Sequence, residues 1–238
     1  MHISERIQAI VNMVSSGHAV CDVGCDHAYT SIALVTNGKC PYAVASDVRP
    51  GPLAAAKTNI VSAGVGDRIE ICLYDGVPAD VHERLPAGKR TLIITGMGGM
   101  LICQILERAG DKAAAFDEMV LSPQSDPDRV RYLLTEMGFI IKDETMLIDE
   151  GKFYVVMRAE HAKGICPNLT QAEALYGPVL LKKQDPVLRT YLTRQENVFK
   201  KVKDSLRKAG RGPGDERYRE ISEEQEVLIE ACRYYEDN

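Results

Sequence analysis

The stretch Ala19–Tyr29, with the sequence AVCDVGCDHAY, most constrains how this chain folds. It begins with Ala19–Val23, a short, mostly apolar run typical of a buried strand, and continues through a turn at Gly24. It ends in the first turn of a helix that we predict to begin at Asp26. A strand, a glycine turn and a helix in this order predict the first βα junction of a doubly wound sheet, where nucleotide-type ligands bind at helix N-termini.

A second apolar run, Tyr42–Ser46, leads directly into Asp47. In such folds an acidic residue about 20 positions beyond the glycine turn holds ribose hydroxyls. We therefore predict that Asp47 binds the ribose of a nucleotide-type ligand, with Val48 beside it in the same loop.

The turn itself does not suit a dinucleotide. The dinucleotide fingerprint is G-x-G-x-x-G, whereas only Gly24 is present here, followed by Cys25 and Asp26. The carboxylates of Asp22 and Asp26 would repel a pyrophosphate but attract the ammonium and sulfonium groups of S-adenosylmethionine. The alternative is that Asp26 only caps the helix that follows, a position that Asp favours.

The rest of the first two thirds of the chain alternates strand and helix patterns. Further strands are expected at Arg68–Leu73, Thr91–Thr95 and Met119–Leu121, and helical patterns follow the last two of them. Two later runs, Phe139–Ile148 and Phe153–Ala159, read as an antiparallel hairpin. This order predicts an α/β fold with a seven-stranded, mostly parallel sheet and one antiparallel strand, which resembles the Rossmann-like class I methyltransferase fold.

The loops after these strands should share one crevice, because the carboxyl ends of parallel strands meet at the same edge of the sheet. Asp75 and Gly76 follow the third strand, where Asp75 would accept a hydrogen bond from an adenine amino group or simply form an Asp-Gly turn. The glycine-rich segment Gly96–Gly99 follows the fourth strand and would let backbone approach a flat base, or form a helix-entry turn.

Composition narrows the class of protein. The formal net charge of −5, taken over the whole chain, argues against nucleic-acid binding. The seven cysteines are scattered through apolar runs, as in a reducing compartment, and Cys21 and Cys25 lack partners at zinc-ligand spacing, so we expect no metal site. No signal peptide or membrane-spanning run is evident. We expect a cytoplasmic protein that is a monomer or a weakly associating dimer.

The pattern changes near Lys163, so we predict a methyltransferase-like domain over residues 1–162 and a helical domain over residues 163–238. Two heptad seams, separated by a glycine-rich turn at residues 210–214, predict an antiparallel coiled-coil hairpin. Residues 182–211 contain ten basic and three acidic residues. These cations would bind RNA, or would pair with the glutamates of the second helix or face water.

Several motifs together resemble the bacterial tRNA (adenine-N1)-methyltransferases of the TrmK type. They are DVGCDHAY at residues 22–29, LYDG at 73–76, ITGMGG at 94–99 and EGKFY at 150–154. The resemblance spans essentially the whole chain and implies a class I enzyme that uses S-adenosylmethionine to methylate N1 of adenine 22 in tRNA. The chain departs from the usual family pattern at Cys25, at Asp47 and in the loop Ser122–Gln124.

The expected reaction needs alignment more than acid–base catalysis, since adenine N1 already carries a lone pair. A carboxylate such as Asp26 would stabilise the cationic product. The residues predicted to act at the target base are Asp26, His27, Tyr29, Thr95, Gly96 and Met97. The residues predicted to bind the cofactor are Asp22, Gly24, Cys25, Asp26, Asp47, Val48, Asp75, Gly76 and Gly96.

Other functions stay open at this point. The same fold serves methyltransferases that act on another RNA, a protein or a small molecule, and a chain of this kind could also be a non-catalytic RNA-binding scaffold. His27 and Tyr29 have equally plain interpretations as packing residues of the helix that follows the glycine turn.

Overall fold

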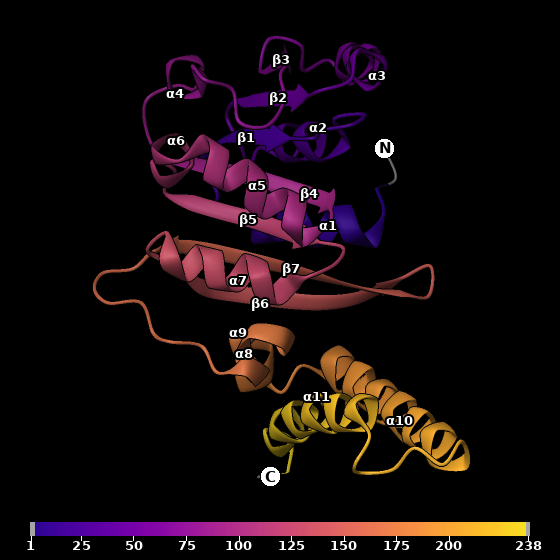
Figure 1. The fold of residues 1–238 in the computed structure, drawn as a ribbon. Helices are drawn as coiled ribbons and strands as arrows, with labels where there is room; N and C mark the ends of the chain where they lie inside the picture. The colour runs from indigo at the N-terminus through magenta and orange to yellow at the C-terminus, as the bar shows by residue number, and fades with distance from the viewer. Residues whose placement is uncertain (1–2, 237–238) are drawn as a thin grey trace. The chain divides into compact units, whose positions relative to one another are not determined.

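The computed structural model describes residues 3–236 and divides the chain into two compact units, Met1–Pro167 and Asn168–Asn238. Figure 1 shows the elements of each unit in sequence order. Each unit is described separately below.

The first unit is built on a seven-stranded sheet with the strand order β3-β2-β1-β4-β5-β7-β6. The strands β1 to β5 pair in parallel, whereas β7 is antiparallel to both of its neighbours. The sheet therefore confirms the predicted α/β class and the terminal antiparallel hairpin. The strands are β1 (Ala19–Val23), β2 (Ala43–Asp47), β3 (Ile69–Leu73), β4 (Arg90–Met97), β5 (Glu118–Pro123), β6 (Phe139–Asp149) and β7 (Lys152–His161).

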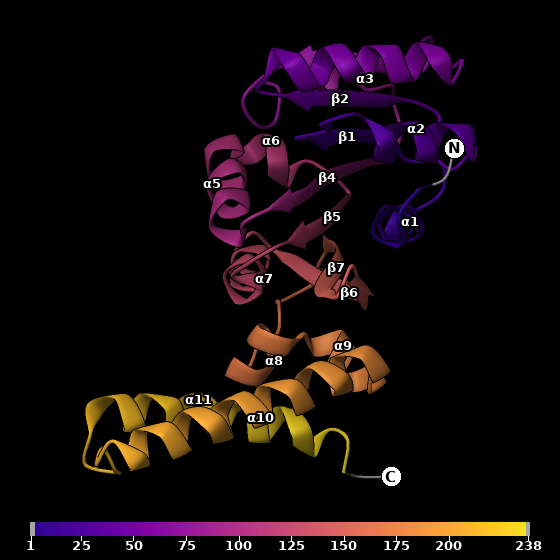
Figure 2. The same ribbon diagram turned by 90° about the vertical axis from the view of Figure 1, so that its right-hand side faces the viewer.

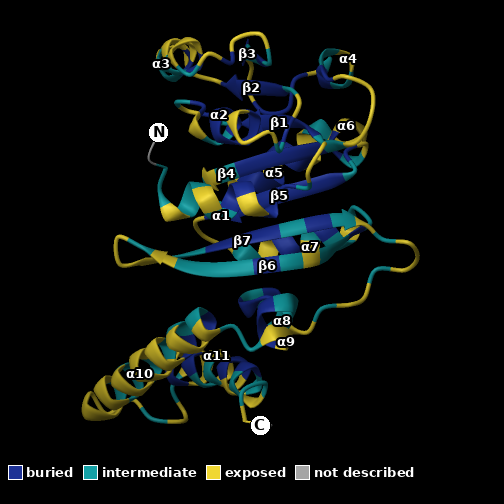
Figure 3. Ribbon diagram, turned by 180° about the vertical axis from the view of Figure 1, so that it is seen from behind, coloured by how far each residue is buried: buried dark blue, intermediate teal, exposed yellow. Residues whose placement is uncertain are grey.

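Helices cover both faces of this sheet. In Figure 2, α5, α6 and α7 lie on one side of the sheet, and α1 and α2 lie on the other. The helices of this unit are α1 (Glu5–Met13), α2 (Tyr29–Thr36), α3 (Pro50–Ser62), α4 (Val81–Arg84), α5 (Gly99–Ala109), α6 (Asp111–Ala114) and α7 (Pro127–Glu136). Because both faces are covered, the residues of β1, β2 and β5 are buried throughout (Figure 3).

Two element boundaries differ from the predicted ones in ways that shape the site. Helix α2 begins at Tyr29 rather than at Asp26, because Asp26 and Ala28 have φ angles of 50° and 58°, which a right-handed helix does not allow. The residue at the N-cap is Ala28, so the interpretation of Asp26 as a helix cap is wrong. Strand β4 extends to Met97, with a register shift between Thr95 and Met97.

A buried carboxylate fastens α1 to the edge of the sheet where the parallel strands begin. Glu118, at the start of β5, is fully buried and accepts hydrogen bonds from the Ser15 backbone N–H at 3.0 Å and the Ser15 hydroxyl at 2.5 Å. The Thr91 hydroxyl donates to it at 2.8 Å, and Arg158 lies 3.5 Å away. These partners supply the hydrogen bonds that a buried carboxylate requires.

The second unit consists of four helices, α8 (Gln171–Tyr176), α9 (Pro178–Lys183), α10 (Pro186–Lys208) and α11 (Glu216–Arg233). Helices α10 and α11 contact each other along a hairpin whose turn lies in the glycine-rich segment. The Lys203 ammonium donates to Gln225 at 2.6 Å, and the Arg207 guanidinium donates to the Tyr218 hydroxyl at 2.7 Å. The helical hairpin is as predicted, and its coiled-coil packing stays a prediction.

The two predicted heptad seams, one from Leu188 to Ala209 and one from Tyr218 to Tyr235, are only partly buried. Their buried members are Leu188, Leu192, Tyr218, Ile221 and Leu228, whereas Ala209, at the end of the first seam, is exposed. Within residues 3–236, no helix has the length and apolar character needed to cross a membrane.

Candidate functional site

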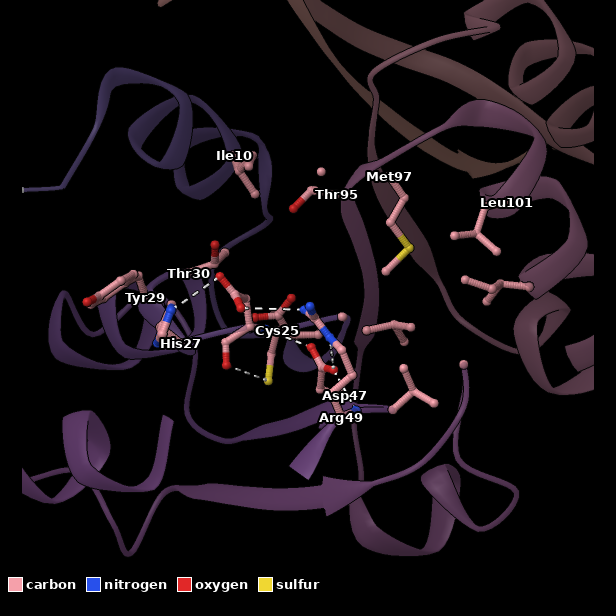
Figure 4. A pocket seen from close by; sticks show the side chains of 18 of the residues that line it. Ile10, Cys25, His27, Tyr29, Thr30, Asp47, Arg49, Thr95, Met97 and Leu101 are labelled. Carbon is pink, nitrogen blue, oxygen red and sulfur yellow. Dashed lines mark hydrogen bonds and ion pairs between the residues drawn. The ribbon is translucent and has the colours of Figure 1, made fainter. Parts of the chain in front are cut away.

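A cavity of about 570 Å³ lies at the carboxyl ends of β1, β2 and β4 and takes in the loops after these strands and after β3 (Figure 4). It sits where the strand order reverses between β1 and β4, the place at which ligands bind in open α/β sheets. Every site residue predicted from the sequence lines this cavity, namely Asp22, Gly24, Cys25, Asp26, His27, Tyr29, Asp47, Val48, Asp75, Gly76, Thr95, Gly96 and Met97.

The glycine turn after β1 is bonded to the end of β2. The backbone N–H groups of Gly24 and Cys25 both donate to the Ser46 carbonyl, at 2.8 Å and 2.9 Å. Gly24 has a φ angle of 69°, a conformation that glycine adopts without strain. The turn therefore holds the first loop of the site against the second.

Asp47 accepts hydrogen bonds at both of its carboxylate oxygens. The Asp26 backbone N–H donates to Oδ2 at 3.2 Å, and the Arg49 backbone N–H donates to Oδ1 at 2.9 Å. Asp47 is only 4% exposed, although it lines the cavity. A carboxylate fixed in this way can accept further hydrogen bonds from ribose hydroxyls without reorganising.

The Asp26 side chain lines the cavity, is exposed, and lies near Arg49 and His27. Its carboxylate lies 3.6 Å from the Arg49 guanidinium and 3.6 Å from His27 Nε2. Because these groups are 43–65% exposed, the Arg49 ion pair and the His27 contact are weak in water, and a bound ligand can replace them. The left-handed backbone of Asp26 is a conformation that clusters at functional sites.

Asp22 is a buried carboxyl at the floor of the site. Burial raises its pKa to about 6, a hydrogen bond from the Ser31 hydroxyl at 2.7 Å lowers it in part, and the charge of Asp47 raises it further. A bound cation would offset this cost, because an opposite charge close by favours the ionised carboxylate.

Cys25 forms part of the wall as a small apolar residue. Its side chain is 8% exposed, and burial together with the charge of Asp22 raises the pKa of its thiol well above the usual range. A thiol in this environment stays protonated and is a poor nucleophile. Cys25 therefore contributes shape to the cavity.

Asp75 lies at the rim and is bound by an arginine from α5. The Arg108 guanidinium donates to both carboxylate oxygens, at 2.8 Å and 3.1 Å, and this pairing raises the pKa of Arg108. Both side chains are more than half exposed. The predicted hydrogen bond from Asp75 to an adenine amino group would therefore compete with Arg108 or share the carboxylate with it.

The glycine-rich segment after β4 packs closely against the loop after β5. The Met97 carbonyl accepts from the Gln124 N–H at 2.8 Å, and the Gly99 N–H donates to the Ser125 carbonyl at 2.9 Å. A Cβ at Gly99 would lie 2.4 Å from that carbonyl oxygen, so only glycine fits there. The two loops therefore form one bonded wall of the cavity.

His27 and Tyr29 lie on the side of the cavity opposite Met97 and Leu101, as Figure 4 shows. Their ring centroids are 5.7 Å apart, and Tyr29 is 39% exposed. The His27 carbonyl accepts a hydrogen bond from the Asn59 side chain at 3.0 Å, which ties this loop to α3. The exposed rings leave a face on which a flat ligand can stack.

Several lining residues were missed in the sequence. Helix α1 contributes Arg6, Ile7 and Ile10 to the cavity, and none of the three was among the predicted site residues. Residues four apart share one face of a helix, so the pairing of Arg6 with Ile10 was the available signal. Thr30, Tyr74, Leu101 and Ile105 were missed as well, because nothing in a single sequence marks them.

The described part of the chain contains no group of three or more His, Cys, Asp or Glu side chains able to hold a metal ion. The residues that converge on the cavity are instead carboxylates, glycines and aromatic rings.

Several known proteins are similar in sequence to this chain over nearly its whole length. A curated tRNA (adenine(22)-N(1))-methyltransferase of Bacillus subtilis is 28% identical over 97% of each chain. The structure of Sp1610 from Streptococcus pneumoniae in complex with S-adenosyl-L-methionine is 28% identical, covers 97% of this chain and 99% of its own, and has a TM-score of 0.81. The structure of the B. subtilis m1A22 tRNA methyltransferase TrmK is 27% identical, covers 97% of this chain and 98% of its own, and also has a TM-score of 0.81.

The family model described as TrmK, tRNA (adenine(22)-N(1))-methyltransferase, matches residues 20–230, which include both the sheet and the helical hairpin. The chain therefore belongs to the TrmK family.

Proposed function

We propose that this protein transfers a methyl group from S-adenosylmethionine to N1 of an adenine in tRNA, at position 22 as in the relative from B. subtilis. The observation that carries the proposal is the set of carboxylates around one cavity at the switch point of the sheet, above all Asp47 with its two backbone donors. Family membership supports the same reaction.

The cavity suits the cofactor in size and in charge. Its volume of about 570 Å³ falls within the range of small-molecule sites, roughly 300–1,000 Å³. Asp47 would hold the ribose, and Asp22 and Asp26 would face the cationic methionine part. When bound, S-adenosylmethionine supplies an electrophilic methyl group, so the protein needs no activated nucleophile of its own.

The protein's own task is to orient the adenine and exclude water. Thr95 and the backbone of Gly96 lie at the end of β4, where they can accept hydrogen bonds from the exocyclic amine of the base. Tyr29 and His27 can stack on the base, and Met97 closes the opposite side of the cavity. Asp26 would stabilise the positive charge that the base acquires at N1.

A base in folded tRNA is stacked, so it must leave the stack before N1 can reach this cavity. We propose that the basic helix α10 holds the tRNA while this occurs. In the described part of the chain, none of the cations Lys200, Lys201, Lys203, Arg207 and Lys208 forms an ion pair with a glutamate of α11. Apart from Arg207, which lies 3.7 Å from Asp204 of its own helix, the charge of these side chains remains available for phosphates.

We further propose that the protein acts in the cytoplasm, where its tRNA substrate and cofactor occur, and that it works as a monomer or a weakly associating dimer.

The test is mass spectrometry of nucleosides from a tRNA transcript incubated with the protein and S-adenosylmethionine. We expect 1-methyladenosine with the native transcript and none with a transcript that carries guanosine at position 22. Asp26→Asn serves as the matched site variant and should reduce the product. Turnover of the cofactor without 1-methyladenosine would indicate another methyl acceptor, and no cofactor binding by calorimetry would indicate a non-catalytic scaffold.

A further inference from the structure

The helical unit has a cavity of its own, with a volume of about 880 Å³, between α8, α10 and α11. Its apolar lining consists of Leu175, Tyr176, Phe199 and Val227. The rest of its lining is mostly acidic, and among the described lining residues Arg217 is the only cation. The acidic residues all come from α11 and are Glu220, Glu223, Glu224, Glu226 and Glu230.

Most of this negative charge has no partner within the protein. Glu220 accepts a hydrogen bond from the Arg217 guanidinium at 2.8 Å, and both side chains are about half exposed. Over residues 3–236, the other four glutamates of the cavity form no ion pair. Neighbouring carboxylates repel one another, so a cation that enters the cavity would be bound favourably.

The hydroxyl of Tyr176 is a second, independent feature that points to a ligand. Tyr176 is only 9% exposed, yet within the described residues its hydroxyl takes part in no hydrogen bond. No fully buried polar side-chain atom of these residues lacks a partner, so the hydroxyl reaches a surface, and Tyr176 lines this cavity. Burial raises the pKa of Tyr176 well above its usual range, so the hydroxyl stays neutral and its oxygen can accept a hydrogen bond.

The spacing of the glutamates favours a long cation over a compact one. In the part of the chain that the structure describes, no three His, Cys, Asp or Glu side chains are grouped closely enough to hold a metal ion. The glutamates from Glu220 to Glu230 recur every three or four residues, which is about 4.5–6 Å along a helix axis. Ammonium groups joined by three or four methylenes lie about 5–6 Å apart, as ordinary bond lengths require.

We propose that this cavity binds a linear polyamine, a chain of methylenes that carries several ammonium groups. The ammonium groups would pair with the glutamates of α11, and one of them would donate a hydrogen bond to the Tyr176 hydroxyl. The methylenes would pack against Phe199 and Val227. The cavity volume falls within the range of small-molecule sites, roughly 300–1,000 Å³.

Occupancy of this site has a consequence for the substrate. The glutamates lie on the same helical hairpin as the basic helix α10, so without a cation they would repel the phosphates of a tRNA bound there. A polyamine in the cavity would cancel part of this repulsion. That consequence rests on the proposed function, whereas the binding of the polyamine itself does not.

The direct test is calorimetry of the full-length protein with spermidine at moderate salt, without RNA or S-adenosylmethionine. We expect one spermidine to bind per chain. Replacing Glu223 and Glu224 together with Gln should weaken binding by about tenfold or more, because charge-assisted contacts are lost. Tyr176→Phe removes only the hydroxyl, so it should weaken binding about threefold and leave the melting temperature unchanged.

The matched control replaces Glu196 and Glu216 with Gln. Both are exposed glutamates of the same helical unit, and neither lines the cavity. The control variant should therefore bind spermidine as the native protein does. Magnesium chloride at the same ionic strength should not displace spermidine, because a compact cation cannot reach several glutamates at once.

Three outcomes would overturn the proposal. One is equal spermidine affinity in the Glu223/Glu224 variant and in the control, which would mean that α11 attracts cations without a defined site. The second is native affinity in Tyr176→Phe or displacement of spermidine by magnesium. The third is no spermidine binding together with self-association that the Glu223/Glu224 variant loses, which would assign the cavity to a basic helix of a second copy. A protein that binds spermidine but yields no 1-methyladenosine would contradict the proposed function and leave this site in place.

Discussion

The methyl group of Met97 lies directly over Gly24, so that a Cβ on Gly24 would be 2.0 Å from Met97 Cε. We predict that Gly24→Ala abolishes measurable cofactor binding, because the added carbon displaces Met97 into the cavity and strains a backbone with a φ angle of 69°. Calorimetry with S-adenosylmethionine measures the binding, and thermal unfolding should show a lower melting temperature.

The double variant Gly24→Ala with Met97→Ala separates the two causes. It removes the clash but keeps the backbone strain, so cofactor binding should return in part while the melting temperature stays low. Full recovery of both quantities would show that the φ angle at Gly24 is unimportant.

Asp22→Asn should stabilise the fold while it weakens cofactor binding. Because the pKa of Asp22 is raised from 3.8 to about 6, the unfolded chain loses this proton at lower pH than the native protein does. Stability from this group is therefore present below pH 4 and is lost as the pH rises through about 6, by about 3 kcal/mol. Asn can still accept the Ser31 hydrogen bond without carrying a charge.

The measurement is the free energy of unfolding of both proteins from pH 4 to pH 8, without cofactor. The native protein should fall below Asp22→Asn as the pH rises, and the two curves should converge at low pH. Cofactor affinity of the native protein should decrease below pH 6, since a protonated Asp22 no longer attracts a cation. Parallel stability curves would mean that Asp22 titrates normally.

Asp47→Ala should weaken S-adenosylmethionine binding about ten- to a hundredfold, because a buried acceptor for the ligand is lost. The same change leaves the N–H groups of Asp26 and Arg49 without their acceptor, so we expect a fall in stability of about 1 kcal/mol as well. Asp67→Ala, at an exposed position away from the cavity, is the charge-matched control. Cofactor affinity equal to that of the control would remove Asp47 from the binding site.

Replacing Lys200, Lys201, Lys203, Arg207 and Lys208 with Gln should abolish tRNA binding at moderate salt and leave cofactor affinity unchanged. Each neutral side chain removes a contact that releases counterions from RNA. A filter-binding titration measures tRNA affinity, and calorimetry measures the cofactor. A matched set of glutamate-to-glutamine changes at Glu220, Glu223 and Glu226 on α11 should leave tRNA binding equal or stronger. Retained binding by the Gln variant would assign tRNA recognition to other surfaces.

Much of the fold could be predicted because its strands are short apolar runs that end at glycine, proline or polar turn residues. Ala19–Val23 was predicted at its observed bounds, and the hairpin followed from the turn around Gly151. The start of α2 was misplaced because Asp26 and Ala28 adopt left-handed conformations that tertiary contacts impose and that non-glycine residues rarely show. Helices α4 and α6, each a single turn, are too short to give a periodic signal.

The site was predictable to the extent that it follows strand ends. Asp22, Asp47, Asp75 and Thr95 all lie at or just after the carboxyl end of a parallel strand, and all line the cavity. The contribution of α1 was not predictable in the same way, because the helix precedes the first strand and its place beside the cavity depends on its packing against α2, β5, β6 and β7. Arg108 beside Asp75 is a comparable case, since the pair is separated by a whole βα unit.

The hydrogen bonds from Ser15 to Glu118 connect the edge of the sheet where the parallel strands begin with the cavity at its other edge. Glu118 accepts hydrogen bonds from Ser15, just after the C-terminal end of α1, and Arg6 at the N-terminal end of that helix lines the cavity. Because this contact fixes α1, Glu118→Gln should let the helix shift and lower methyl transfer, although Glu118 itself does not line the cavity.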